Sequence, residues 1–218
     1  MPFSDPLADG VVNQLAAERG LRSGTTLKRV LKTVAALRKA GLQMPIVLYV
    51  YFNLIHRHGV KQFARDAATA GVDGVLALDL PPEEAAAYEQ AVKRADIHPI
   101  FLIAPTTPER RVAEISQHAS GFIYYVSREG VTGIQKTVSQ TIRPMLGKIR
   151  KYSRLPVSVG FGISTPQQAW AVAHTADAVV VGSAIVNQIA KTGRDRRMVE
   201  KVTRFVAPMV NAVKGTRR

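Results

Sequence analysis

The sequence predicts an α/β protein built on a parallel sheet. Short apolar runs recur along the 218 residues, and amphipathic segments of helical spacing separate them. Runs that are apolar throughout are typical of parallel strands buried on both faces, and their alternation with helices indicates βαβ units. The runs cover residues 45–51, 75–79, 99–104, 122–126, 156–161 and 178–182. Six strands suit an open doubly wound sheet, whereas a closed (β/α)8 barrel needs eight.

Start and stop signals delimit the expected helices. Thr26 is a candidate N-cap and Gly41 a candidate stop for one helix, because a threonine hydroxyl accepts from the first turn and glycine adopts positive φ. Pro82 opens another, since proline suits the first helical turn. The expected helices lie at 26–41 and 60–71, from 82, from 107, and at 135–151, 166–174 and 196–214. Residues 1–10 form a loop, and no linker divides the chain, which predicts a single domain over 1–218.

The composition excludes several classes of site. The chain has no cysteine, which rules out disulfides and cysteine-based metal or nucleophile sites. Its five histidines show no metal-ligand spacing, and we expect His56 and His58 in a loop. No metal or nucleotide cofactor is therefore implied. With no apolar run near ~20 residues and no secretory signal, we expect a cytoplasmic enzyme without a membrane partner.

The net charge of +14 comes from 30 lysines and arginines against 16 acidic residues. A positive field of this size favours anionic ligands, nucleic acid or acidic partners. The cations are dispersed over several expected helices, which is typical of solvated outer faces. Neither a zinc pattern nor an RNA-binding aromatic motif accompanies them. The sequence therefore predicts no nucleic-acid partner.

Two glycine-rich turns follow consecutive strands near the end of the chain. Gly160–Ser164 follows the fifth strand and Gly182–Ile185 the sixth. Glycine allows a ligand close to the backbone, and N–H groups at a helix start hold phosphate. Loops after the last two strands of barrels commonly do this. The pair predicts a phosphate site, although each turn alone also fits an ordinary strand-to-helix connection.

A further polar segment, Ser127–Gly133, follows the fourth strand. Its threonine stands between two glycines, as expected of a mobile lid over an active site. An ordinary surface loop is the alternative interpretation.

Taken together, these motifs resemble the tryptophan synthase α subunit family, in its order and spacing. The matching segments are Pro2–Gly10, Tyr51–Asn53, Asp79–Pro81, Ser127–Gly133, Gly160–Ser164 and Gly182–Ile185. The resemblance implies a (β/α)8 TIM barrel, here truncated at the N-terminus, with about six of eight strands present. It also implies cleavage of indole-3-glycerol phosphate to indole and glyceraldehyde 3-phosphate in tryptophan biosynthesis. The indole passes to a β chain that carries pyridoxal phosphate, in an α2β2 heterotetramer, and no cofactor is expected in the α chain.

The resemblance assigns roles to individual residues. Asp9 is the catalytic carboxylate that faces the indole N–H, and Asp5 in the same loop faces the β chain. Thr132 lies on the lid and reaches back toward Asp9. The expected phosphate ligands are Gly133, Gly162, Gly182 and Ser183. The residues expected against the indole ring are Tyr124, Phe161, Leu76 and Leu102.

The sequence departs from the family at its start. The family has a second catalytic carboxylate, a glutamate that ends the strand just before the Pro2–Gly10 loop, and these 218 residues do not contain it. The first strand, first helix and second strand are expected to be absent with it. A longer reading frame, a degraded gene copy and a genuine short form would each explain this. The remaining glutamates are expected to be solvated on helices: Glu18, Glu83, Glu84, Glu89, Glu109, Glu114 and Glu200.

The chain as given is therefore expected to be inactive or impaired, because losing a proton-transfer group costs ~10²–10⁴-fold in rate. Two other functions stay open. One is a non-catalytic subunit that binds a tryptophan synthase β chain through the Asp5 loop. The other is a different phosphate-binding barrel enzyme, such as a sugar-phosphate isomerase, which would need another acid/base pair.

Overall fold

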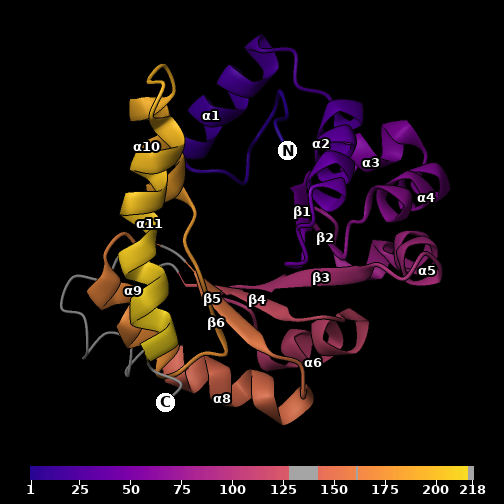
Figure 1. Ribbon diagram of the computed structural model, residues 1–218. Helices are drawn as coiled ribbons and strands as arrows, with labels where there is room; N and C mark the ends of the chain where they lie inside the picture. Colours follow the sequence, from indigo (N-terminus) through magenta and orange to yellow (C-terminus); the bar gives the residue numbers. More distant parts are fainter. Residues whose placement is uncertain (128–141, 161, 216–218) are drawn as a thin grey trace. The chain divides into compact units, whose positions relative to one another are not determined.

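The computed structural model describes residues 1–127, 142–160 and 162–215, which fall into two compact units (Figure 1). Unit 1 comprises residues 1–102 and 118–121, and unit 2 comprises residues 103–117 and those from 122 onward. The single domain expected over residues 1–218 stays a prediction.

Unit 1 consists of three parallel strands and the helices that connect them. Its elements are α1 (Val11–Arg22), α2 (Leu27–Lys39), β1 (Val47–Val50), α3 (Phe52–His58), α4 (Val60–Ala70), β2 (Gly74–Ala77), η1 (Pro82–Glu84), α5 (Ala86–Arg94) and β3 (His98–Ile103), whose last residue belongs to unit 2. The strands pair in chain order. Leu48 lies opposite Val75, and Leu76 opposite Ile100. The first three predicted strands are confirmed.

Local signals explain where the helices of unit 1 begin and end. The Thr26 hydroxyl accepts from the N–H of Arg29 at 3.3 Å, which confirms the predicted N-cap. Gly71 ends α4 with φ at 89°, a conformation that costs glycine little and other residues much.

One helix of unit 1 was not expected from the sequence, α3. His56 and His58 lie in α3 rather than in a loop, so that prediction was wrong. The reason is tertiary: the N–H of Phe52 at the start of α3 donates to the Asp79 carboxylate at 2.6 Å. A carboxylate from a neighbouring strand end therefore caps a helix whose own sequence carries no cap.

The first strand departs from the expected burial on both faces. In β1, Leu48 and Val50 are buried, whereas Val47 and Tyr49 remain 36% and 40% exposed. Only β2 pairs with β1 among the described residues. β1 is thus an edge strand with one face buried, although its sequence is apolar on both.

Glu89 is a further correction. It was expected to be solvated, but it is 8% exposed on α5. Its Oε1 lies 2.5 Å from Nδ1 of His118, and its Oε2 accepts from Nζ of Lys93 at 2.9 Å. A buried carboxylate needs such partners, because an unpaired buried charge is costly. The Glu89 carboxylate therefore links α5 to His118 within unit 1.

Unit 2 repeats the strand–helix alternation. Its elements are α6 (Glu109–His118), whose last residue belongs to unit 1, β4 (Ile123–Val126), α8 (Arg143–Tyr152), β5 (Val157–Gly160), α9 (Pro166–Ala173), β6 (Ala178–Val180), α10 (Ser183–Thr192) and α11 (Met198–Lys214). The three strands pair in parallel and in chain order, with Tyr125 opposite Val159 and Val159 opposite Val179. The last three predicted strands are confirmed.

Helix α9 packs on α11 in unit 2. Its Trp170, the single tryptophan of the chain, is 40% exposed. The Trp170 ring lies against that of His174 in a tilted arrangement, with 4.0 Å between the centroids, and the backbone oxygen of Trp170 lies 2.9 Å from Nδ1 of the same histidine. The His174 side chain therefore contacts both the ring and the backbone oxygen of Trp170 at the C-terminal end of α9.

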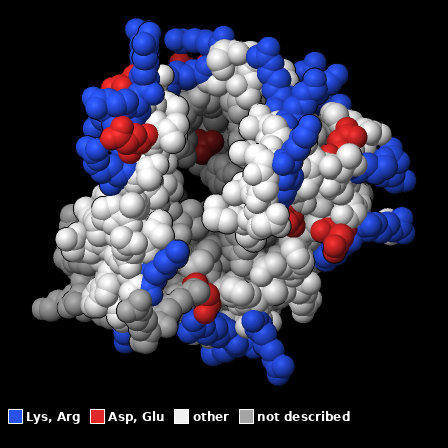
Figure 2. All heavy atoms as spheres, in the orientation of Figure 1, with Lys and Arg blue, Asp and Glu red and all other residues white. Residues whose placement is uncertain are grey.

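Lysine and arginine side chains are visible on both units on the face shown in Figure 2, rather than gathered over one element. This agrees with the dispersed pattern read from the sequence. Among the residues described, no helix is both long and apolar enough to cross a membrane.

Candidate functional site

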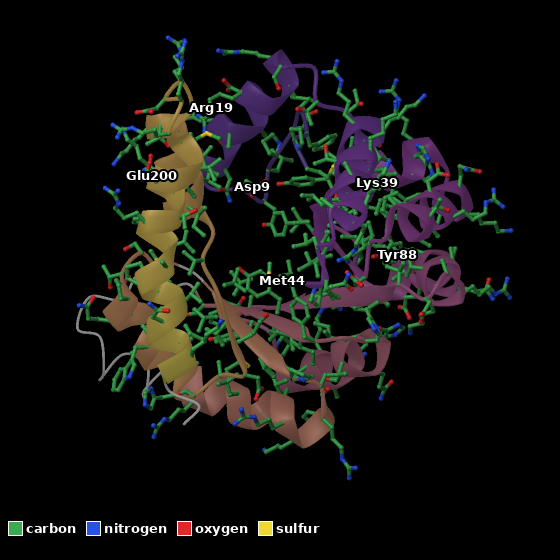
Figure 3. All side chains as sticks on the ribbon, in the orientation of Figure 1. Asp9, Arg19, Lys39, Met44, Tyr88 and Glu200 are labelled. Carbon is green, nitrogen blue, oxygen red and sulfur yellow. The ribbon has the colours of Figure 1, made fainter. Side chains whose placement is uncertain are left out.

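Asp9 lies in unit 1 on the loop that leads into α1 (Figure 3). Its half-buried carboxylate is held from two sides. The Tyr51 hydroxyl donates to Oδ2 at 3.0 Å, and the side-chain amide of Asn13 donates to Oδ1 at 3.3 Å. Gln14 donates to its backbone oxygen at 2.8 Å. Two donors, one on each oxygen, fix the orientation of the carboxyl group.

Tyr51 belongs to the matching segment Tyr51–Asn53, but its sequence context predicts no role for it. It directly follows β1 and is 3% exposed. Its hydroxyl accepts the N–H of Ala8 at 3.0 Å while it donates to Asp9. Burial, followed by the hydrogen bond to Asp9, raises the pKa of Tyr51 to about 12. Its position directly after a buried strand was the available signal, because strand ends carry the functional groups of barrels.

Asp5 lies on the same loop and is exposed. It accepts from the Ser4 hydroxyl at 2.5 Å. Leu7, two residues later, is 92% exposed. An exposed carboxylate beside an exposed leucine suits contact with another molecule more than contact with a buried ligand.

The two leucines expected against the indole ring lie on neighbouring strands of unit 1. Leu76 in β2 is 3% exposed and lies opposite Tyr49 and Ile100. Leu102 in β3 is half-buried. Their roles toward a ligand stay predictions.

Tyr124 lies in β4 of unit 2, and burial raises the pKa of its hydroxyl. A Cβ built on Gly160 would stand 2.7 Å from that hydroxyl oxygen, 2.7 Å from Cβ of Val180 and 3.0 Å from the backbone oxygen of Val180. Any side chain at Gly160 would displace Tyr124 or the neighbouring strand. Gly160 is therefore required for packing, and it keeps Tyr124 where the sheet places it.

The first glycine turn leads into α9. Gly162 is exposed and has φ at 67°. Farther on, Thr165 and Gln168 form a capping box, in which Gln168 Oε1 accepts from the N–H groups of Ser164 and Thr165 at 2.7 and 3.1 Å. The N–H groups of Ser164 and Thr165 at the start of α9 are therefore already hydrogen-bonded within the chain.

The second glycine turn leads into α10 and is different. Gly182 and Ser183 are exposed, no side chain among the described residues caps the helix, and a Cβ on Gly182 would meet nothing within 4 Å. The first N–H groups of an α-helix have no intrahelical acceptor. The start of α10 therefore presents free donors and the positive end of the helix dipole, as an anion site requires.

Three predicted site residues, Thr132, Gly133 and Phe161, lie outside the described residues, as does most of the expected lid. Within the described ranges, no group of three or more metal-ligating side chains comes together.

The family model for the tryptophan synthase alpha chain matches residues 1–214. This chain belongs to that family. The alpha chain of Opitutus terrae is 47% identical over 215 residues, which cover 98% of this chain and 80% of that protein. The alpha chain of Geotalea daltonii is 51% identical over 188 residues, 86% of this chain and 71% of that protein. Membership of this family supports the lyase class and the place in tryptophan biosynthesis that the sequence predicts.

Solved structures give the same answer for the fold. The alpha subunit of Legionella pneumophila superposes with a TM-score of 0.89 at 35% identity, covering 99% of this chain and 80% of that one. An alpha chain from the Pyrococcus furiosus tryptophan synthase complex gives 0.85 at 34% identity, with 96% and 83% covered. The predicted TIM-barrel class of α/β fold, with its six strands, is confirmed.

Proposed function

We propose that this chain is a tryptophan synthase α subunit that acts on indole-3-glycerol phosphate by retro-aldol cleavage. The observation that carries the proposal is the Asp9 carboxylate, held half-buried by Tyr51 in the loop that the family places at its active site. In this reaction C3 of the indole gains a proton and the glycerol hydroxyl next to it loses one. The bond between C3 and the glycerol carbon breaks, which releases indole and glyceraldehyde 3-phosphate.

Asp9 serves the step in which charge develops on the ring. Protonation at C3 leaves positive charge shared with the ring nitrogen, and a fixed carboxylate that accepts the N–H stabilises this charge. Because Asp9 is already oriented by two donors, little reorganisation is needed when the charge appears.

The phosphate end of the substrate is proposed to bind at the start of α10. Gly182 and Ser183 present exposed backbone donors there, and Gly162 supplies a second glycine turn. The roles assigned to Thr132, Gly133 and Phe161 rest on the family resemblance alone. Tyr124, Leu76 and Leu102 are proposed to contact the indole ring.

The 218-residue polypeptide, prepared by itself, is proposed to turn over slowly. The family's second carboxylate is not among these residues, and no described glutamate stands on a strand end that would replace it. Since a general acid or base contributes ~10²–10⁴-fold, turnover should fall by about that factor relative to an intact family member.

The test measures glyceraldehyde 3-phosphate release together with calorimetric binding of indole-3-propanol phosphate, a substrate mimic. We expect slow release, clear binding of the mimic, and weaker binding in D9N. Tyr152→Phe is the control, because its hydroxyl meets Glu109 in an exposed contact of unit 2. Release near the rate of an intact family member would contradict the proposed impairment. A wild-type chain that binds a sugar phosphate but not the mimic would contradict the proposed substrate.

We also propose a β chain as partner, docked on the loop that carries Asp5. The support is the exposure of Asp5 and Leu7 and the α2β2 complex reported for the similar Pyrococcus furiosus protein. A titration into a β chain should change the β-chain turnover, and Asp5→Asn should weaken that effect. No change on addition of the wild-type chain would exclude docking, including docking as a non-catalytic subunit.

A further inference from the structure

Tyr51 meets the loop that carries Asp9 at three points. Its ring packs on Phe3 with 5.0 Å between the centroids. Its hydroxyl accepts the N–H of Ala8 and donates to Oδ2 of Asp9, each at 3.0 Å. The Tyr51 side chain thus contacts Phe3 near the beginning of the loop, and Ala8 and Asp9 near its end.

Tyr51 is itself well fixed. It is 3% exposed and stands between β1 and α3, where its backbone oxygen accepts the N–H of Leu54 at 3.1 Å. A loop such as residues 3–9 has little secondary structure to hold it, whereas a residue at the end of a strand inherits the rigidity of the sheet. Functional groups on loops need such support to hold a productive geometry.

The hydroxyl of Tyr51 both donates and accepts a hydrogen bond within this loop. A phenol has one hydrogen to donate, and here it is given to Asp9 while a lone pair takes the N–H of Ala8. With Asn13 on Oδ1, both oxygens of Asp9 have a donor, and among the described residues each oxygen accepts one such bond, which leaves it a further lone pair. The carboxylate is therefore held without being closed to a further N–H.

We propose that Tyr51 is the positioning residue for Asp9: its hydroxyl orients the carboxylate toward the substrate ring by tethering Ala8 and Asp9 to the end of β1. The inference rests on the proposed function of Asp9. Tyr51 is not a catalytic residue in this assignment, because it acts through Asp9 and touches no reacting atom. Its removal should thus matter only while the Asp9 carboxylate is present.

The test is a double-mutant cycle on the 218-residue chain, with Tyr51→Phe, Asp9→Asn and the double variant. Phenylalanine keeps the ring packing on Phe3 and removes only the hydroxyl. Calorimetric binding of indole-3-propanol phosphate should weaken about tenfold in Y51F, the factor expected for one lost hydrogen bond to a charged group. The double variant should bind no more weakly than D9N, since the carboxylate that Tyr51 orients is already gone. A purely structural role would instead give additive losses.

A second measurement follows the tether directly. Hydrogen exchange at the amide of Ala8 should be faster in Y51F than in the wild type, because its acceptor is removed. Tyr152→Phe is the matched control: it also removes a tyrosine hydroxyl bonded to a carboxylate, Glu109 at 2.9 Å, and should leave Ala8 exchange and binding unchanged.

The outcomes separate the two proposals. Wild-type binding in Y51F, or additive losses in the double variant, would overturn the positioning role while leaving the proposed substrate intact. Failure of the wild-type chain to bind the mimic would contradict the proposed function. In that case unchanged exchange at Ala8 in Y51F would also overturn the tether, and faster exchange would support it.

Discussion

The two glycine turns of unit 2 look alike in sequence, but the helices that follow them differ in how their first N–H groups are bonded. At the start of α9, Gln168 accepts from the N–H groups of Ser164 and Thr165, so the donors are used within the chain. At the start of α10, no side chain of the described residues caps the helix, and Gly182 and Ser183 are open to solvent. The difference teaches that similar glycine turns can leave different helix N–H groups open to a ligand, and that capping decides which of them are already bonded.

The largest effect should come from the glycine required for packing. Gly160→Ala places a methyl 2.7 Å from both the Tyr124 hydroxyl and Cβ of Val180. Because the sheet must shift to make room, we expect a loss of about 3 kcal/mol in the free energy of unfolding. Urea denaturation measures this.

Gly182→Ala is the matched control for that change, because its methyl meets nothing within 4 Å. Its stability should stay within about 0.5 kcal/mol of the wild type, while binding of indole-3-propanol phosphate weakens. Equal destabilisation by the two substitutions would remove the distinction between the two glycines.

An intermediate effect is expected at the start of α9. Thr165→Ala removes the hydroxyl that accepts from the N–H of Gln168 at 3.2 Å. Loss of an N-cap typically costs about 1 kcal/mol, so the midpoint of urea denaturation should fall. Binding of the phosphate mimic should change little, since the N–H groups of Ser164 and Thr165 are already bonded to Gln168 and Gly162 is left in place. A large loss of binding in T165A would show that the start of α9 contributes donors to the phosphate site.

The smallest stability effect is expected at α10, with the opposite sign. Ser183→Asp places a carboxylate in the first turn, where the helix dipole favours negative charge by ~0.3–1 kcal/mol. We therefore expect slightly higher stability and a loss of mimic binding, because the new carboxylate competes with the phosphate. Ser183→Asn, which adds no charge, is the control. Unchanged mimic binding in S183D would exclude the start of α10 as the anion site.

Much of this contrast was readable in the sequence. The run Thr165-Pro166-Gln167-Gln168 is a capping-box pattern. The N-cap of α10 is Gly182 and the residue three positions later is Ile185, so no capping box can form there. The sequence prediction grouped both turns as phosphate ligands because it weighed the glycines alone. The six strands were predictable for a simpler reason, since each is a continuous apolar run.

Other features depended on contacts between distant residues. Helix α3 begins where Asp79 from another element accepts the N–H of Phe52, and no local signal announces it. Glu89 was expected to be solvated because it lies on a helix rather than at a strand end, yet His118 and Lys93 allow it to be buried. The role of Tyr51 likewise appears only when β1 and residues 8–9 are brought together.

The contact between Trp170 and His174 has a spectroscopic consequence. Excitation at wavelengths that only tryptophan absorbs reports α9 of unit 2 and nothing else, since the chain has one tryptophan. The six tyrosines divide between the units, since Tyr49, Tyr51 and Tyr88 lie in unit 1 and the other three in unit 2, so the near-ultraviolet tyrosine signal reports both units. Coincident melting of the two signals would identify one cooperative transition, and separate melting would identify two. The single tryptophan thus makes it possible to follow the unfolding of unit 2 without any label and to compare it with the unfolding of the whole chain.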